Sequence, residues 1–173
     1  LIVQLQSTPL TSLANHYDQG KVIAISKLLI PVDVVNGKKI RLGRNHDGGY
    51  VLIDEGNFDK LYSYGIGDDI SFETAFVNRS PVDAYLYDHT IEALPVKDYS
   101  NLLHWKKEGV AAYKQKDCNT IQAHIGENRD KNKQQLVLKM DVEGAEWQSL
   151  ANLEEENLKQ FRQVVLELHG LTS

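Results

Sequence analysis

Apolar residues in the second half of the chain gather in short continuous runs, which alternate with segments of helical character. We expect strands at residues 61–64, 83–88, 109–113, 136–140 and 163–168. We expect helices at residues 72–78, 120–125 and 146–150. Continuous apolar strands that alternate with helices are typical of a parallel sheet covered on both faces. The pattern predicts an α/β, Rossmann-like three-layer sandwich with a mostly parallel sheet.

The first third of the chain has a different pattern. Apolar positions at helical spacing predict a helical N-terminal segment over residues 1–35, which Pro31 helps to end. The pair Gly48-Gly49 stands between two β-prone stretches, which predicts a small antiparallel hairpin within residues 36–56. Residues 57–173 form the predicted core. We find no repeat or linker, so we expect one domain over residues 1–173.

Composition and charge narrow the possible functions. The 42% apolar and 25% charged residues are typical of a globular protein. The formal net charge of −5 disfavours generic binding to nucleic acid or to an anionic membrane surface. No apolar run approaches the roughly 18 residues that a membrane-spanning helix needs. No basic-then-apolar leader is visible, so we expect a cytoplasmic location, and Cys118 alone forms no intrachain disulfide.

A glycine loop follows the first predicted core strand. Gly65 and Gly67 would let the backbone turn sharply and approach a ligand closely, with free amides at the start of the next helix. Asp88 ends the second strand, 21 residues after Gly67, and an acid at that spacing can accept hydrogen bonds from ribose hydroxyls. Loop and acid together indicate a nucleoside-cofactor site, although a tight turn without a ligand is an alternative.

The residues after the loop discriminate between cofactors. Sites for NAD normally carry a third glycine, so that the helix N-terminus can face a pyrophosphate. Here Asp68 and Asp69 occupy that position, and their carboxylates would repel phosphate. S-adenosylmethionine has no phosphate and carries a positive sulfonium and an ammonium group, which acids tolerate or attract.

Acidic residues also crowd the end of the fourth core strand. Residues 138–147 leave a hydrophobic strand and enter a helix, and they include Asp141, Glu143 and Glu146. A solvated role at the helix N-terminus would account for Glu143 and Glu146 but not for Asp141. His169 follows the next strand, so we expect it near Asp141 at the same edge of the sheet. Such a cluster suits a general base held by an acid, a divalent cation, or a histidine with a structural role only.

These residues resemble the FkbM-type family of S-adenosylmethionine-dependent methyltransferases. Residues 138–147 are similar to the family signature K-x-D-x-E-G-x-E, and further similar motifs run in the same order over residues 40–170. The supporting motifs are Arg41-Leu42-Gly43, Asp47-Gly48-Gly49-Tyr50, Gly65-Ile66-Gly67 with Phe72-Glu73, and Glu167-Leu168-His169-Gly170. The sequence departs from the family pattern at Ser63, where an acid is common, and at Asp69, where a third glycine is usual.

The resemblance implies a class I methyltransferase fold with assigned site residues. The cofactor-binding residues would be Gly65, Ile66, Gly67, Glu73, Asp88 and Asp141. The catalytic residues would be Asp141, Glu143 and His169. A complete fold of this class has two strands more than the five counted here, so we also expect a sheet truncated after the fifth core strand.

The resulting functional prediction is methyl transfer from S-adenosylmethionine to a small-molecule hydroxyl acceptor, a sugar or a natural product, with a divalent metal as a further option. Three alternatives stay open. One is a non-catalytic nucleoside-binding or interaction module that retains the fold. Another is an NAD-dependent oxidoreductase, which Asp68 and Asp69 disfavour. The third is a purely structural domain.

Overall fold

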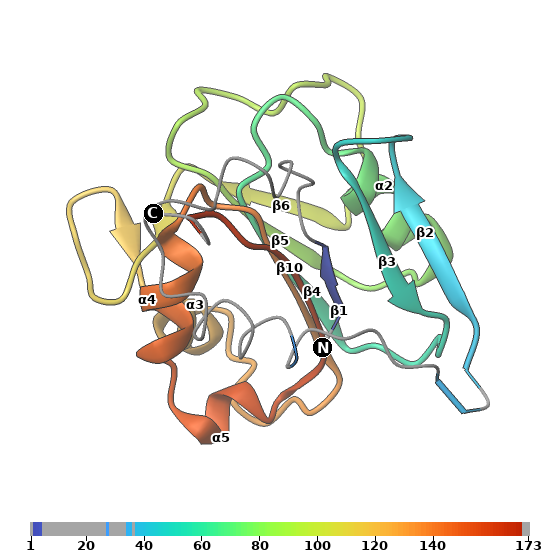
Figure 1. The fold of residues 1–173 in the computed structure, drawn as a ribbon. Coiled ribbons are helices and arrows are strands. Elements are labelled where there is room, and N and C mark those ends of the chain that lie inside the picture. The colour runs from blue at the N-terminus through green and yellow to red at the C-terminus, as the bar shows by residue number, and fades with distance from the viewer. Residues whose placement is uncertain (1, 5–26, 28–33, 36, 171–173) are drawn as a thin grey trace, which may run out of the picture.

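A parallel sheet of six strands forms the centre of the molecule (Figure 1). The computed structural model describes residues 2–4, 27, 34–35 and 37–170. Every strand of this sheet is parallel to its neighbours. The order across the sheet is β1 (Ile2–Gln4), β10 (Phe161–Glu167), β9 (Leu136–Met140), β4 (Lys60–Tyr64), β5 (Ala84–Tyr87) and β6 (Leu103–Lys106).

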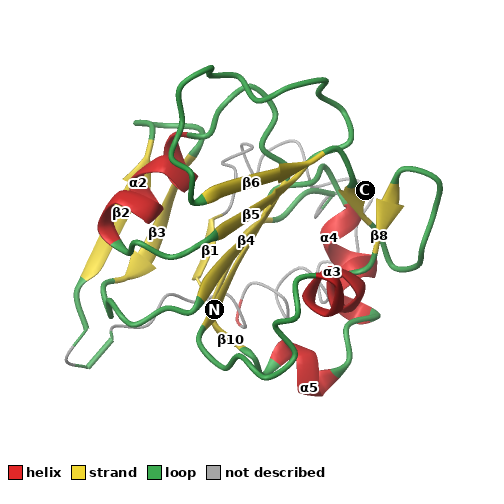
Figure 2. Ribbon diagram, turned by 180° about the vertical axis from the view of Figure 1, so that it is seen from behind, coloured by secondary structure: helices red, strands yellow, loops and turns green. Residues whose placement is uncertain are grey.

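Separate layers cover the two faces of the sheet (Figures 1 and 2). On one face lie α2 (Ser71–Arg79) and an antiparallel hairpin of β2 (Lys39–Gly43) and β3 (Gly49–Ile53). On the other lie α3 (Ile121–Glu127), α4 (Ala145–Ala151) and α5 (Glu155–Leu158). The α/β three-layer prediction is therefore confirmed, as are the hairpin and the helices expected near residues 72–78, 120–125 and 146–150.

The central strands bury both of their faces, as their continuous apolar runs predict. Leu61 of β4 packs in the cluster that contains the α2 residues Phe72 and Phe76. The neighbouring Tyr62 and Tyr64 face the opposite layer, in the cluster that contains the α3 residues Ile121 and Ile125. A strand that is apolar on both faces is stable only between two layers, which fixes β4 and β9 in the middle of the sheet.

The prediction of a core strand at residues 109–113 is wrong. The next strand beyond β5 is β6, whereas β7 (Gly109–Val110) pairs with β8 (Cys118–Asn119) in a separate parallel pair. Because β6 is an edge strand, its residues alternate between buried or half-buried Leu103 and Trp105 and exposed His104 and Lys106. That alternation gives no continuous apolar run, so the pattern favoured the wrong segment.

The prediction of a helical N-terminal segment is wrong at residues 2–4. Residues 2–4 form β1, which pairs with β10 in the register Ile2 with Val165. Lys27 is helical, and most of the remainder of residues 1–35 lies outside the described residues. Ile2 and Val3 are β-branched, which favours a strand over a helix. No helix in the described part of the chain has both the length and the apolar character needed to cross a membrane.

One side chain fastens the hairpin to the sheet. The Gln163 side chain of β10 accepts a hydrogen bond from the Ile53 amide at 2.8 Å and donates one to the Ile53 carbonyl at 2.8 Å. This amide pair joins β3 to the main sheet at the end of the hairpin opposite its Gly48-Gly49 turn. It thus sets the position of the hairpin over the sheet.

Replacing Gln163 with Leu should lower the free energy of unfolding by about 1–3 kcal/mol, because the substitution leaves the Ile53 amide without its partner and the Ile53 carbonyl with the Glu55 amide alone. Urea denaturation followed by circular dichroism measures this loss. Arg162→Gln is the control, since it removes only an exposed ion pair with Glu55 and should change stability little. Equal stability of Gln163→Leu and the wild-type chain would contradict the role of this contact.

Candidate functional site

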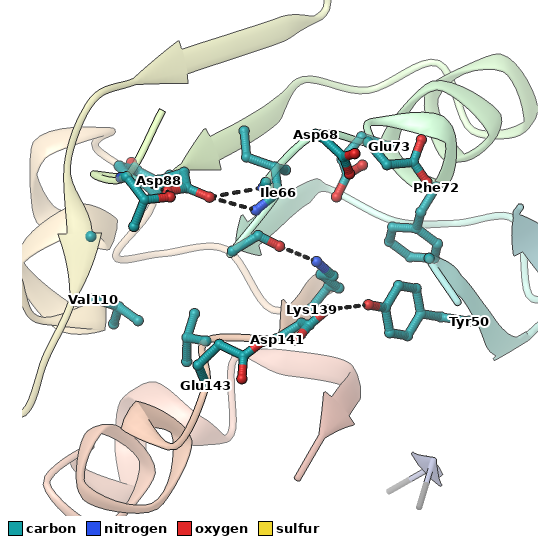
Figure 3. Close-up of a pocket in the computed structure, with 18 of the residues that line it drawn as sticks. Tyr50, Ile66, Asp68, Phe72, Glu73, Asp88, Val110, Lys139, Asp141 and Glu143 are labelled. Atoms are coloured by element: carbon teal, nitrogen blue, oxygen red, sulfur yellow. Dashed lines mark hydrogen bonds between the residues drawn. The ribbon is translucent and has the colours of Figure 1, made fainter. Parts of the chain in front are cut away.

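A cavity of about 400 Å³ opens at the carboxyl ends of β4, β5 and β9. The sheet order reverses there, because the chain passes from β4 to β5 on one side and returns as β9 on the other. Ligands of open α/β sheets bind at such a switch point. Figure 3 shows Asp88 on one side of the cavity, Tyr50 and Phe72 on another, and Asp141 and Glu143 at the end of β9.

The glycine loop lines the cavity, and its two glycines are required for different reasons. Both have a left-handed backbone, with φ of 73° at Gly65 and 49° at Gly67. A Cβ atom on Gly65 would also overlap the carbonyl oxygen of Asp141, whereas one on Gly67 would meet no atom within 4 Å. Gly65 therefore permits both the turn and the close packing of the β4 and β9 ends, while Gly67 permits only the turn.

Asp88 lies beside this loop, as its spacing predicts, and it holds the loop in place. One carboxylate oxygen accepts hydrogen bonds from the amides of Ile66 at 3.0 Å and Gly67 at 2.9 Å. The other accepts from the Thr90 amide at 2.7 Å and the Thr90 hydroxyl at 2.6 Å. Burial acts to raise the pKa of Asp88, but these four hydrogen bonds outweigh it and keep the pKa below its ordinary value.

Lys139 ties the loop to β9 and to the hairpin (Figure 3). Its side chain is buried, with Nζ donating to the carbonyl oxygen of Gly65 and lying 5.1 Å from the centre of the Tyr50 ring. The Tyr50 hydroxyl donates a hydrogen bond to Asp141 Oδ2 at 2.6 Å. Burial and the neighbouring Asp141 raise the pKa of Tyr50 well above its ordinary value, so this hydroxyl stays a donor. Its position after Asp47-Gly48-Gly49 was the only sequence signal for Tyr50.

Glu73 reaches the floor of the cavity from α2. Its carboxylate accepts a hydrogen bond from the hydroxyl of Ser63, and its side chain is almost fully buried. Burial raises the pKa of Glu73 even though the positive charge of Lys139 opposes the shift. Ser63 stands where the resemblance leads us to expect an acid. The carboxylate of Glu73, from α2, lies next to this position.

The acids at the end of β9 lie around His169, which follows β10. The distances from His169 Nε2 are 3.8 Å to Asp141 Oδ1 and 3.5 Å to Glu143 Oε2. Glu143 is a non-glycine residue with a left-handed backbone, at φ of 54°. Such a conformation costs free energy and is most common at functional sites. The structure therefore brings together the three residues that the resemblance implies to be catalytic.

Two further acids in this cluster were noted in the sequence but were not assigned to the site. Glu146 is fully buried, and its Oε1 accepts from His169 Nδ1 at 2.8 Å and from the Val142 amide at 3.0 Å. A solvated first-turn role for Glu146 is therefore wrong, whereas the exposed Glu143 fits one. Glu167, the last residue of β10, places Oε1 3.8 Å from His169 Nε2. Burial acts to lower the pKa of His169, but the Glu146, Glu143 and Asp141 carboxylates raise it above its ordinary value.

The cavity is strongly acidic. Among the described residues that line it, the carboxylates are Asp47, Asp68, Asp69, Glu73, Asp88, Asp141 and Glu143. The lining lysine and arginine are Lys139 and Arg44. Lys139 is engaged with Gly65, and Arg44 forms an ion pair with Asp69 at 3.0 Å. The site therefore suits a positively charged ligand far better than a phosphate.

Comparison with known proteins identifies the family. Residues 37–173 match the model of the methyltransferase FkbM domain. The chain belongs to the FkbM methyltransferase family. Membership of this family supports methyl transfer as the general class of function of this domain.

Two curated relatives agree with this family assignment. The chain is 32% identical over 119 residues to the probable methyltransferase-like protein 24 of Rattus norvegicus and 30% identical over the same length to that of Homo sapiens. Each match covers 64% of this chain and 32% of the relative, so the chain spans about a third of the length of these proteins. No solved structure matches the chain significantly.

The two glycines of the loop offer a matched pair of substitutions. Gly65→Ala should lower the free energy of unfolding by about 2–5 kcal/mol, because it adds a clash with Asp141 to an unfavourable backbone angle. Gly67→Ala should cost only about 1 kcal/mol, since its Cβ atom enters open space. Thermal and urea denaturation measure both. Similar losses for the two variants would show that the close approach at Gly65 is unimportant.

Proposed function

We propose that this FkbM domain binds S-adenosylmethionine over the loop Gly65–Gly67 and transfers its methyl group to a hydroxyl of a small acceptor, such as a sugar or a natural product. The family supports methyl transfer in general. The observation that carries the finer proposal is the excess of carboxylates over lysines and arginines around the cavity. S-adenosylmethionine supplies a sulfonium and an ammonium to match those carboxylates and brings no phosphate.

The loop and Asp88 account for the nucleoside half of the cofactor. Gly67 lines the cavity and has no side chain in the open space beside it, so a ligand can approach the loop backbone closely. Asp88 lines the cavity at the end of β5, and a ribose hydroxyl would reach its carboxylate by replacing the Thr90 hydroxyl as a donor. Ile66 and Val110 supply apolar surface in the same cavity for a base. The cavity volume of about 400 Å³ lies in the range typical of small-molecule sites.

The cluster at the ends of β9 and β10 lies where an acceptor would react. Methyl transfer to a hydroxyl needs an oxygen aligned with the sulfonium methyl and a group that removes the proton. Asp141 and Glu143 line the cavity, and His169 lies behind them. The candidate proton acceptors are Asp141 Oδ1 and His169 Nε2. The other oxygen of Asp141 already bonds to Tyr50, and the other ring nitrogen of His169 already bonds to Glu146.

Calorimetric titration of the full chain tests the cofactor assignment. We expect S-adenosylmethionine and its demethylated product S-adenosylhomocysteine to bind one site, and NAD⁺ not to bind, because Asp68 and Asp69 would face its pyrophosphate. Asp88→Ala should weaken cofactor binding at least about tenfold, since it removes both the ribose partner and the anchor of the loop. Asp98→Asn, at an exposed acid that does not line the cavity, is the control and should leave cofactor affinity unchanged.

Other outcomes of this titration favour the alternatives. Cofactor binding without S-adenosylhomocysteine release from any acceptor in a panel of sugars and hydroxylated natural products would favour a non-catalytic nucleoside-binding module. Binding of NAD⁺ in preference to S-adenosylmethionine would favour an oxidoreductase. Absence of binding by both compounds to a folded chain would contradict the nucleoside site itself.

A further inference from the structure

We propose that Asp141, Glu167 and His169 form a binding site for a divalent cation of the Mg²⁺ and Mn²⁺ class, next to the proposed cofactor cavity. The three donor atoms all lie within 4.8 Å of one another. They come from the ends of the neighbouring parallel strands β9 and β10, whose register pairs Met140 with Leu166 and so brings Asp141 and Glu167 side by side.

The spacing of the donor atoms suits a shared ion better than direct hydrogen bonds. His169 Nε2 lies 3.8 Å from Asp141 Oδ1 and 3.8 Å from Glu167 Oε1. Both separations exceed a hydrogen-bond length of roughly 2.7–3.2 Å. Neighbouring donors of an octahedral ion about 2.1 Å from each lie about 3 Å apart, so these side chains would close by less than about 1 Å around a bound ion. The arrangement thus leaves room for an ion between the side chains.

Partners from other elements orient two of the three donors. His169 Nδ1 bonds to the buried Glu146 at 2.8 Å, which directs Nε2 toward the acids. Tyr50 donates to Asp141 Oδ2 at 2.6 Å, which leaves Oδ1 on the side of His169. A carboxylate on the second nitrogen of a ligating histidine and a hydrogen bond on the second oxygen of a ligating carboxylate are common features of metal sites.

The charge of the cluster also favours a bound cation. Glu146 and Glu167 are 0% and 4% exposed, and Asp141 and Glu143 lie close to them around the same imidazole. Buried carboxylates at such distances repel one another unless a positive charge lies between them. A protonated His169 supplies one charge, and a divalent ion supplies two. Glu146 Oε2, fully buried and without a hydrogen-bond partner among residues 37–170, is a further sign that this charge is incompletely balanced.

A second acid-histidine cluster shows what a balanced arrangement looks like. Glu108, His124 and Glu127 also place donor atoms within 4.8 Å of one another. There Lys106 Nζ forms ion pairs with both glutamates, at 2.7 Å to Glu127. A lysine therefore supplies the positive charge that a metal would otherwise bring. We therefore infer no metal ion at that cluster, and it provides a control for the first.

The donor set indicates the class of cation and its use. Two carboxylates with one imidazole, and an exposed Glu143 nearby, favour ions that prefer oxygen ligands. Structural zinc, in contrast, is usually held by several thiolates. This use rests on the proposed function and replaces direct proton transfer to Asp141 or His169. An ion held by these residues would bind the acceptor hydroxyl next to the cavity and lower its pKa, so that the hydroxyl proton leaves to solvent more easily.

Electron paramagnetic resonance of Mn²⁺, titrated into the full chain without cofactor, tests the site. We expect one bound ion per chain, displaced by Mg²⁺. Asp141→Asn and His169→Gln should weaken Mn²⁺ binding more than about 100-fold, and Glu146→Gln by about 10–100-fold through the orientation of His169. Glu127→Gln, in the cluster that Lys106 balances, should leave Mn²⁺ binding unchanged.

Several results would overturn the site. These are absence of Mn²⁺ and Mg²⁺ binding by the folded wild-type chain, binding of Zn²⁺ alone, or unchanged binding in Asp141→Asn and His169→Gln. Should a variant fail to fold, broadening of amide NMR signals by Mn²⁺ in the wild-type chain locates the ion, and broadening centred on Glu127 instead of His169 contradicts the proposal. Calorimetry with S-adenosylmethionine on the same samples separates the two proposals. Cofactor binding without metal binding overturns only the cation site. Metal binding without cofactor binding overturns only the cofactor assignment.

Discussion

The close approach of the Gly65 backbone to the Asp141 carbonyl is the constraint on which the site depends. It lets the loop after β4 lie against the end of β9, where the Asp141 amide donates to the Tyr64 carbonyl at 3.0 Å. Lys139 and Asp88 then hold the loop from two sides, through the Gly65 carbonyl and through the amides of Ile66 and Gly67. A larger residue at position 65 would separate the strand ends and open the floor of the cavity.

Around this contact the described residues that line the cavity include more carboxylates than lysines and arginines. The central carboxylates Asp88 and Asp141 are oriented by hydrogen bonds from Thr90 and Tyr50, and His169 lies 3.8 Å from Asp141. Burying or crowding acids in this way is costly, and it is most common where a ligand brings the positive charge. The cofactor proposal and the cation proposal place that charge at two neighbouring positions, over the loop and at the ends of β9 and β10.

The sequence was informative where a local pattern determines the structure. The continuous apolar runs identified the buried strands β4, β5, β9 and β10, and the spacing from Gly67 to Asp88 placed an acid against the glycine loop. The hydrophobic pattern does not predict β6, because this edge strand alternates between buried and exposed residues and has no continuous apolar run. Residues 2–4 were assigned to a helix, because a strand so short has too few residues to show a period.

Other site contacts could not be predicted, for a different reason. Tyr50 and Glu146 act through contacts with residues 91 and 23 positions away, and both contacts depend on how strands and helices meet in space. A tyrosine after a turn or a glutamate on a first helical turn is common in any chain. Only the packing of the hairpin on the sheet and of α4 under His169 shows what these side chains contact.

The most direct measurement is a titration of the isotope-labelled chain with S-adenosylmethionine, followed by amide NMR signals. The amides of Ile66, Gly67 and Thr90 donate to Asp88, so a nucleoside that engages this carboxylate should shift their signals most. Saturable shifts centred on these three residues are the expected result. Shifts confined to other surfaces, or unchanged signals at these positions with the ligand in excess, would contradict the account.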